Sequence, residues 1–175
     1  VKQLTGAQVM MMDKDVPNAK NIHPGGKDLP IDRVLHDNDK VTLGGTTLTA
    51  HFTPGHTIGS VTWTWNVTEG GKSYVAILPP AIAPNANTKL ADNKEYSNII
   101  PDNEQFYKTM RSMPCDVMLG SHAGFFNLKE KYAKLGQSPN PFIDGKESCL
   151  KQIDEWENLW HMRIEQDKKR IAAGK

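Results

Sequence analysis

The stretch "LTAHFTPGHTIGSVTWTW", residues 48–65, places a histidine in a glycine-containing turn between two segments of alternating side chains. In residues 47–53 apolar side chains alternate with threonine and histidine, and in residues 60–67 valine and tryptophan alternate with threonine and asparagine. Alternation with a period of two is typical of a strand with one buried face. The stretch therefore predicts two sheet strands, with His56 in the turn that joins them.

The segments around this stretch indicate a mixed α/β chain. "KQLTG" reads as a helix end closed by Gly6, because glycine is common just after a helix. Segments rich in proline, glycine and asparagine predict long loops at residues 15–30 and 78–103. Further strands are predicted from apolar or alternating runs at residues 7–13, 40–43, 73–78 and 115–121.

Two helices are predicted in the second half of the chain. One covers residues 103–113 and stops before Pro114. The other begins at Asp144, which forms a D-x-x-E capping box with Glu147. Apolar residues then recur at helical spacing, and we expect them to lie in the core rather than to bind a cofactor. They are Leu150, Ile153, Trp156, Trp160 and Ile164.

Composition sets limits on the class of protein. The chain has 175 residues, 38% hydrophobic and 23% charged, with a formal net charge of +1. These values are ordinary for one globular domain and show no basic excess of the kind that binds nucleic acid. No apolar run is long enough to span a bilayer, so no membrane partner is expected. The opening "VKQLTG" has neither an initiator methionine nor a signal peptide, and we expect the chain to be a piece of a longer protein.

The chain has two cysteines, Cys115 and Cys149. Neither belongs to a C-x-x-C pair, so a thiolate metal site is not expected. Spacing alone leaves open whether they are separate thiols or one disulfide.

Two of the six histidines, His56 and His122, stand apart from the rest. Each follows the end of a predicted strand in a glycine-containing loop, which is where a rigid scaffold presents functional side chains. Neutral imidazole is the commonest protein ligand of zinc, so the two positions suggest a shared metal site. The other histidines are expected to be structural or solvated, and they are His23, His36, His51 and His161.

Residues 48–65, together with "MPCDVMLGSHAGFFNLKEKYAKL" at residues 113–135, resemble the metallo-β-lactamases. The likeness is closest to the third subclass, whose zinc site uses histidines and one aspartate but no cysteine. It extends over residues 1–175 and implies a single domain. The implied fold is a four-layer α/β/β/α sandwich with a dinuclear zinc site at one edge of its two sheets.

The resemblance assigns roles to individual residues. His56 matches the third histidine of the first zinc site, and His122 matches the histidine of the second. Cys115 and Cys149 match a disulfide that many members carry, which a periplasmic or secreted location would permit. We expect His56 and His122 to approach each other at one end of the sheets, with the other histidines elsewhere.

The chain departs from the family pattern in two places. The signature H-x-H-x-D-H does not occur in it, and in the family this motif precedes the segment that matches "KQLTG". We therefore expect the N-terminal part of the fold to be absent from this chain, leaving one recognisable ligand for each zinc. The second departure lies in a loop where relatives often carry serines that hold the substrate carboxylate. This chain has Pro80, Ala81 and Ile82 there, and Ile58 replaces a common proline. Substrate-binding residues are not assigned.

The resemblance implies zinc-dependent hydrolysis of the β-lactam ring of antibiotics by metal-bound hydroxide, and hence antibiotic resistance, in the complete domain. No catalytic residue beyond the metal ligands is implied, and no S-x-x-K or G-x-S-x-G nucleophile motif occurs. One alternative is a hydrolase of the same fold that acts on another ester, a thioester or a lactone. Another is an inactive, metal-free fragment or assembly subunit.

Without the upstream motif, zinc occupancy is expected to be weak or partial. Apolar faces such as that of residues 7–13 would be left uncovered, so we expect the chain to aggregate or to depend on the missing segment or another chain.

Overall fold

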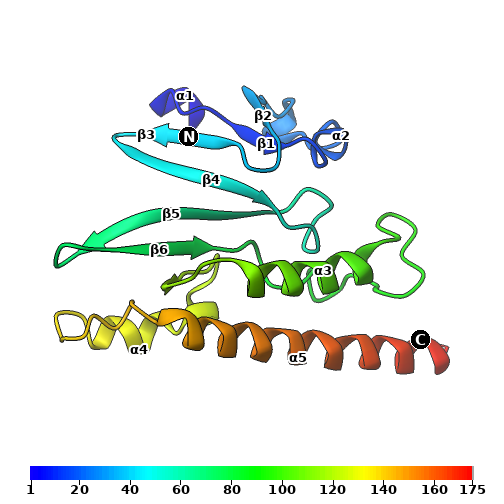
Figure 1. The fold of residues 1–175 in the computed structure, drawn as a ribbon. Helices are drawn as coiled ribbons and strands as arrows, with labels where there is room; N and C mark the ends of the chain where they lie inside the picture. The colour runs from blue at the N-terminus through cyan, green and yellow to red at the C-terminus, as the bar shows by residue number, and fades with distance from the viewer. Residues whose placement is uncertain (175) are drawn as a thin grey trace.

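The computed structural model describes residues 1–174, which form a small two-stranded sheet, a five-stranded sheet and a set of helices (Figure 1). In the small sheet β1 (Met10–Met12) pairs in parallel with β2 (Arg33–Leu35). Three short helices accompany it in the N-terminal part of the chain, namely α1 (Lys2–Thr5), α2 (Val16–Ala19) and the 3₁₀ helix η1 (Pro24–Gly26). The α/β class inferred from the sequence is confirmed.

The five-stranded sheet fixes the direction in which each loop leaves the fold. Its spatial order is β3-β4-β5-β6-β7, with antiparallel pairs from β3 to β6 and a parallel pair between β6 and β7. Strands β4, β6 and β7 therefore run in the same direction, and their C-terminal ends lie at one edge of the sheet. The strands are β3 (Lys40–Leu43), β4 (Thr46–Phe52), β5 (Val61–Glu69), β6 (Lys72–Leu78) and β7 (Val117–Met118).

Strands β3 to β6 confirm the alternating segments predicted from the sequence. The turn between β3 and β4 consists of Gly44 and Gly45, whose φ angles are 56° and 82°. Two successive residues with positive φ are what a tight type I′ hairpin turn requires, and glycine adopts them without strain.

The prediction that these strands bury only one face is wrong, because other elements cover the large sheet on both sides. On one face Ala50, which is 0% exposed, packs with Met12 and Leu35 of the small sheet. On the other face Thr62, also 0% exposed, donates a hydrogen bond to the Met110 sulfur beneath the helices. Its hydroxyl also lies 2.8 Å from that of Thr53, so the buried threonines satisfy one another's polar groups.

The helical layer lies against the β6 end of the large sheet (Figure 1). Helix α3 (Ile99–Ser112) begins at Ile99, earlier than the predicted residue 103. Helix α5 (Gly145–Ala172) confirms the long C-terminal helix. Its buried stripe begins with Cys149 in place of Leu150 and continues through Ile153, Trp156, Trp160 and Ile164. Among the described residues, no helix is both long and apolar enough to cross a membrane.

Short elements differ most from the sequence-based expectations. Strand β2 was not predicted, and α2 and η1 lie within the predicted loop 15–30. The strand expected over residues 115–121 is reduced to Val117–Met118, and it is followed by η2 (Ala123–Phe126) and α4 (Leu128–Ala133). Each of these elements has too few residues for a periodic pattern to be visible in the sequence.

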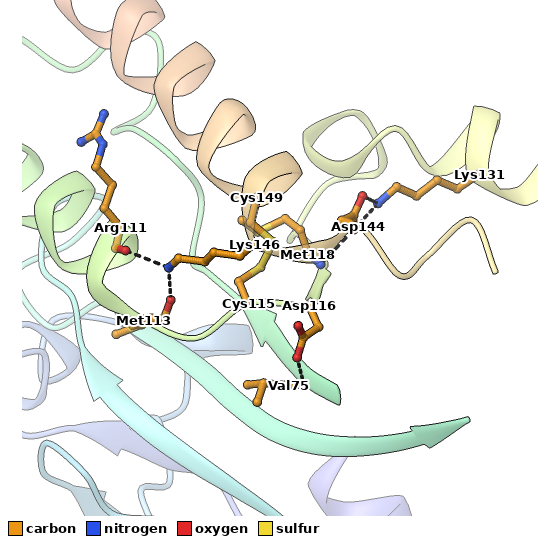
Figure 2. Close-up of a disulfide and its surroundings, with 10 residues drawn as sticks. All are labelled: Val75, Arg111, Met113, Cys115, Asp116, Met118, Lys131, Asp144, Lys146 and Cys149. Carbon is orange, nitrogen blue, oxygen red and sulfur yellow. Dashed lines mark hydrogen bonds and ion pairs between the residues drawn. A yellow bond between two sulfur atoms is a disulfide. The ribbon is translucent and has the colours of Figure 1, made fainter. Parts of the chain in front are cut away.

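The predicted capping box of Asp144 is also wrong, since this residue makes no side-chain cap at the start of α5. Its carboxylate instead lies 2.6 and 2.7 Å from the Lys131 ammonium and accepts a hydrogen bond from the Met118 N–H (Figure 2). The Lys131 and Asp144 side chains are only 12% and 16% exposed. The carboxylate is therefore engaged by Lys131 and by β7, and it makes no bond to the first N–H groups of α5.

The disulfide implied by the family resemblance is present between Cys115 and Cys149, whose Cα atoms lie 6.3 Å apart. It ties the segment before β7 to the first turns of α5 (Figure 2). Lys146 of the same helix donates to the carbonyl oxygens of Arg111 and Met113 at 2.8 and 2.5 Å. These contacts hold β7 between β6 and the long helix.

We predict that replacing both cysteines by alanine lowers the free energy of unfolding by about 3–4 kcal/mol. The reason is that the unfolded chain regains the conformational entropy that a cross-link closing a loop of this length removes. The bond spans a sequence separation of 34. Urea unfolding without reductant measures the effect, and Ser148→Ala, an exposed change on the same helix turn, serves as the control. An unfolding midpoint equal to that of the parent chain would contradict the prediction.

Candidate metal centre

Three loops leave the large sheet at the edge where β4, β6 and β7 end. Residues 53–60 follow β4 and carry His56, residues 79–98 follow β6, and residues 119–122 follow β7 and carry His122. Both histidines were predicted to follow strand ends, and the directions of the strands bring their two loops to the same edge of the sheet.

The His56 ring is half-buried and is oriented by one hydrogen bond. Its Nδ1 lies 2.7 Å from the carbonyl oxygen of Ala83, in the loop after β6. A carbonyl oxygen can only accept, so Nδ1 carries the proton and the neutral ring keeps a lone pair on Nε2. A histidine with one nitrogen held by a backbone carbonyl and the other unprotonated is in the state that a metal ligand requires.

The turn that carries His56 depends on two glycines and on Asp15. Gly55 has a φ of 148°, a conformation that side chains with a Cβ rarely adopt. A Cβ on Gly59 would lie 2.6 Å from both the side chain and the backbone of Asp15. The Asp15 carboxylate accepts the Gly59 N–H at 2.8 Å and the Thr57 hydroxyl at 2.7 Å. The sequence offered no signal for this role, because Asp15 lies in a predicted loop far from residue 59 in the chain.

His122 is presented differently. It is exposed and immediately precedes η2, and its ring meets the Phe125 ring edge-on with centroids 5.0 Å apart. Phe125 in turn packs edge-on against Trp156 of α5 at 6.4 Å. Within residues 1–174 no hydrogen bond engages either nitrogen of the His122 ring, so both are accessible to a ligand.

The remaining histidines have polar partners of their own. Burial lowers the pKa of His51, which keeps that imidazole neutral on its strand. The pairs are His23 with Asp28, His36 with Asp39, His51 with Thr64 and His161 with Glu104.

Among residues 1–174, the one group of three or more side chains spaced to hold a metal ion is Glu104, Glu157 and His161, between α3 and α5. These groups are already engaged, since Arg111 pairs with Glu157 and the Trp160 ring N–H donates to Glu104 at 3.0 Å. His56 and His122 belong to no such group within the described residues. A three-ligand zinc site built on either histidine would therefore need further donors.

No protein-family model matches the chain, but solved structures do. Native FEZ-1 metallo-β-lactamase from Legionella gormanii is 40% identical, with a TM-score of 0.85, and the match covers 95% of this chain and 68% of that chain. BJP-1, a subclass B3 metallo-β-lactamase of Bradyrhizobium japonicum, is 26% identical with a TM-score of 0.84, over 97% and 67% of the two chains. The chain belongs to the metallo-β-lactamases, in subclass B3.

A third structure, metallo-β-lactamase GOB-18 from Elizabethkingia meningoseptica, is 27% identical with a TM-score of 0.77, over 94% and 65% of the two chains. These coverages confirm the metallo-β-lactamase fold over nearly the whole of this chain. They also show that each relative has residues with no counterpart here.

We predict that Gly59→Ala lowers the free energy of unfolding by about 1–3 kcal/mol, the usual cost of overpacking, because the added Cβ displaces Asp15. Gly124→Ala is the matched control, since a Cβ at Gly124 meets no atom within 4 Å and the residue has an ordinary φ. Urea unfolding midpoints of the two variants provide the comparison. Equal midpoints would mean that the contact between Asp15 and Gly59 does not constrain the His56 turn.

Proposed function

We propose that this chain takes part in zinc-dependent hydrolysis of the β-lactam ring, as part of a complete metallo-β-lactamase domain. The observation that carries the proposal is the His56 ring, which lies in a sheet-edge loop with Nδ1 held by the Ala83 carbonyl, so that the lone pair of the neutral ring is on Nε2. Membership of subclass B3 supports it, because the similar solved structures are metallo-β-lactamases.

The donor chemistry fits zinc. His56 would hold one ion through Nε2, and His122 would hold a second ion from the neighbouring loop. When bound, zinc lowers the pKa of a coordinated water to about 7, which makes hydroxide available at neutral pH for attack on a carbonyl. The Ala83 carbonyl keeps the His56 ring in one orientation and one tautomer, which raises the basicity of the ligating nitrogen.

A second candidate function keeps the fold and changes the substrate. Pro80, Ala81 and Ile82 follow β6 at the edge that carries both histidines, and their side chains offer no hydrogen-bond donor to a substrate carboxylate. An uncharged ester, thioester or lactone needs no such donor. Nucleic acid is a poor candidate substrate, because the chain has a formal net charge of only +1.

The disulfide suggests where the protein works. Structural disulfides form and persist in oxidising compartments. The Cys115–Cys149 bond therefore supports a periplasmic or secreted location.

We predict that residues 1–175 alone hydrolyse β-lactams negligibly, because a catalytic zinc takes three protein ligands and each of these loops offers one. The same chain, preceded by a segment that carries H-x-H-x-D-H, is expected to hydrolyse a chromogenic cephalosporin in a chelator-sensitive reaction. Parallel assays with a lactone and a thioester separate the two candidate functions. The zinc content of both purified proteins is measured as well, and the absence of zinc from both would indicate an inactive, metal-free chain. Chelator-sensitive turnover by the short chain at a rate near that of the longer one would contradict the ligand assignment.

In the longer protein, we predict that His56→Ala and His122→Ala each lower kcat/KM at least tenfold, since each removes a metal ligand. His161→Ala is the control, because this histidine is exposed on α5 and pairs with Glu104. If either of the first two variants kept parental activity, that histidine would not be a ligand.

A further inference from the structure

One turn of α3 places two polar side chains in the core. Asn103 is 1% exposed and Tyr107 is 0% exposed. Residues one helical turn apart lie on the same face, so both point toward the sheet edge described above. Burying a polar side chain costs free energy of folding unless its polar atoms are hydrogen-bonded. The hydrogen-bond partners of these two side chains therefore indicate what each one does.

Asn103 holds the loop that carries His56. Its side-chain amide donates to the carbonyl oxygen of Gly55 at 3.1 Å, and Gly55 directly precedes His56. The same amide donates to the Ile99 carbonyl at 2.7 Å, which fixes the side chain against its own helix.

Tyr107 holds the opposing loop. Its hydroxyl donates to the carbonyl oxygen of Ile82 at 2.7 Å, and Ile82 directly precedes Ala83. Burial, with Glu157 and Glu104 nearby, raises the pKa of Tyr107 well above its usual range. The hydroxyl therefore stays protonated and remains a donor at neutral pH.

The two anchored carbonyls flank the hydrogen bond from His56 to Ala83. Asn103 holds Gly55, the residue before the donor His56. Tyr107 holds Ile82, the residue before the acceptor Ala83. We infer that Asn103 and Tyr107 are positioning residues, which hold the two loops at the separation that keeps His56 in its Nδ1–H tautomer with Nε2 free for a metal. This inference rests on the proposed function of His56 as a zinc ligand.

Packing alone does not account for Asn103. Within residues 1–174 its Oδ1 is buried without a hydrogen-bond partner, and leaving such an acceptor unpaired destabilises the folded chain. A leucine would fill similar space without this cost. Asn103 also packs closely against position 55, because a Cβ there would lie 3.0 Å from Oδ1. The bond to Gly55 is what the asparagine provides and an apolar residue cannot.

The tautomer of His56 tests the inference without relying on activity. Long-range ¹H–¹⁵N spectra of the ¹⁵N-labelled chain, at a pH where the imidazoles are neutral, report which ring nitrogen carries the proton. We expect His56 of the parent chain to show the Nδ1–H form alone. Tyr107→Phe and Asn103→Leu are expected to convert it to a mixture of the two tautomers, while His122 and His51 keep their parental spectra.

Controls separate this role from a general loss of structure. Tyr132→Phe removes a hydroxyl from a side chain that is 67% exposed, and it should leave every histidine unchanged. Tyr107→Phe keeps the aromatic ring, which packs edge-on against Phe106 at 5.0 Å, so it decides the question if Asn103→Leu does not fold. The double variant should shift the tautomer ratio by less than the sum of the single shifts, because both residues act through one hydrogen bond.

Two results would overturn the inference. One is a folded Tyr107→Phe chain in which His56 keeps a single tautomer. The other is an equal spectral change at His56, His122 and His51, which would indicate general loosening.

A zinc titration of the longer protein adds a second readout, with an expected loss of affinity of about tenfold in Tyr107→Phe, at the low end for outer-shell partners. An unchanged affinity would overturn the metal-binding part of the inference. If Tyr107→Phe shifted the His56 tautomer but the longer parental protein did not hydrolyse β-lactams, the proposed function would be refuted and the positioning role would stand.

Discussion

The parallel pairing of β6 with β7 is the constraint on which the arrangement of the site depends. Only Ala76 and Ile77 of β6 have partners in β7, so the backbone ladder by itself is too short to fix the strand. The Cys115–Cys149 disulfide supplies what the ladder lacks, together with the Asp116 carboxylate, which accepts the Val75 N–H at 2.8 Å (Figure 2). Because β7 is held in this direction, the loop with His122 leaves the sheet at the same edge as the loop with His56.

The two histidines are supported by different physical means. His56 is held by directional hydrogen bonds, from its own Nδ1 to Ala83 and from the turn around it to Asp15. His122 rests against the ring of Phe125, a contact that sets position without fixing a tautomer. The hydrogen bond of His56 fixes the tautomer and orientation of its ring before any ligand binds, whereas the ring contact of His122 does not fix a tautomer.

Helix α3 connects the core to the site. The residues that build its buried face include Phe106 and Met110, which pack in the main hydrophobic cluster with Trp156 and Trp160 of α5. Asn103 and Tyr107 belong to the same buried face, and they reach the backbone of the two loops on either side of the His56–Ala83 bond. The packing of the helical layer is thereby coupled to the orientation of a single imidazole ring.

Much of the fold followed from the sequence alone, and the sequence also singled out two candidate ligands whose role stays a prediction. Strands β3 to β6 and helix α5 were predicted because each is long enough for its apolar pattern to repeat. His56 and His122 were singled out because each follows a strand in a glycine-containing loop, and the pairing of Cys115 with Cys149 followed from family resemblance. Local pattern could not show that Asp144 pairs with Lys131 rather than capping α5, or that Thr62 lies in the core. It also gave no sign of Asp15, Asn103 or Tyr107 as supports of the His56 loop. Those roles arise from contacts between residues far apart in the chain, and only the tertiary structure, which brings them together, decides them.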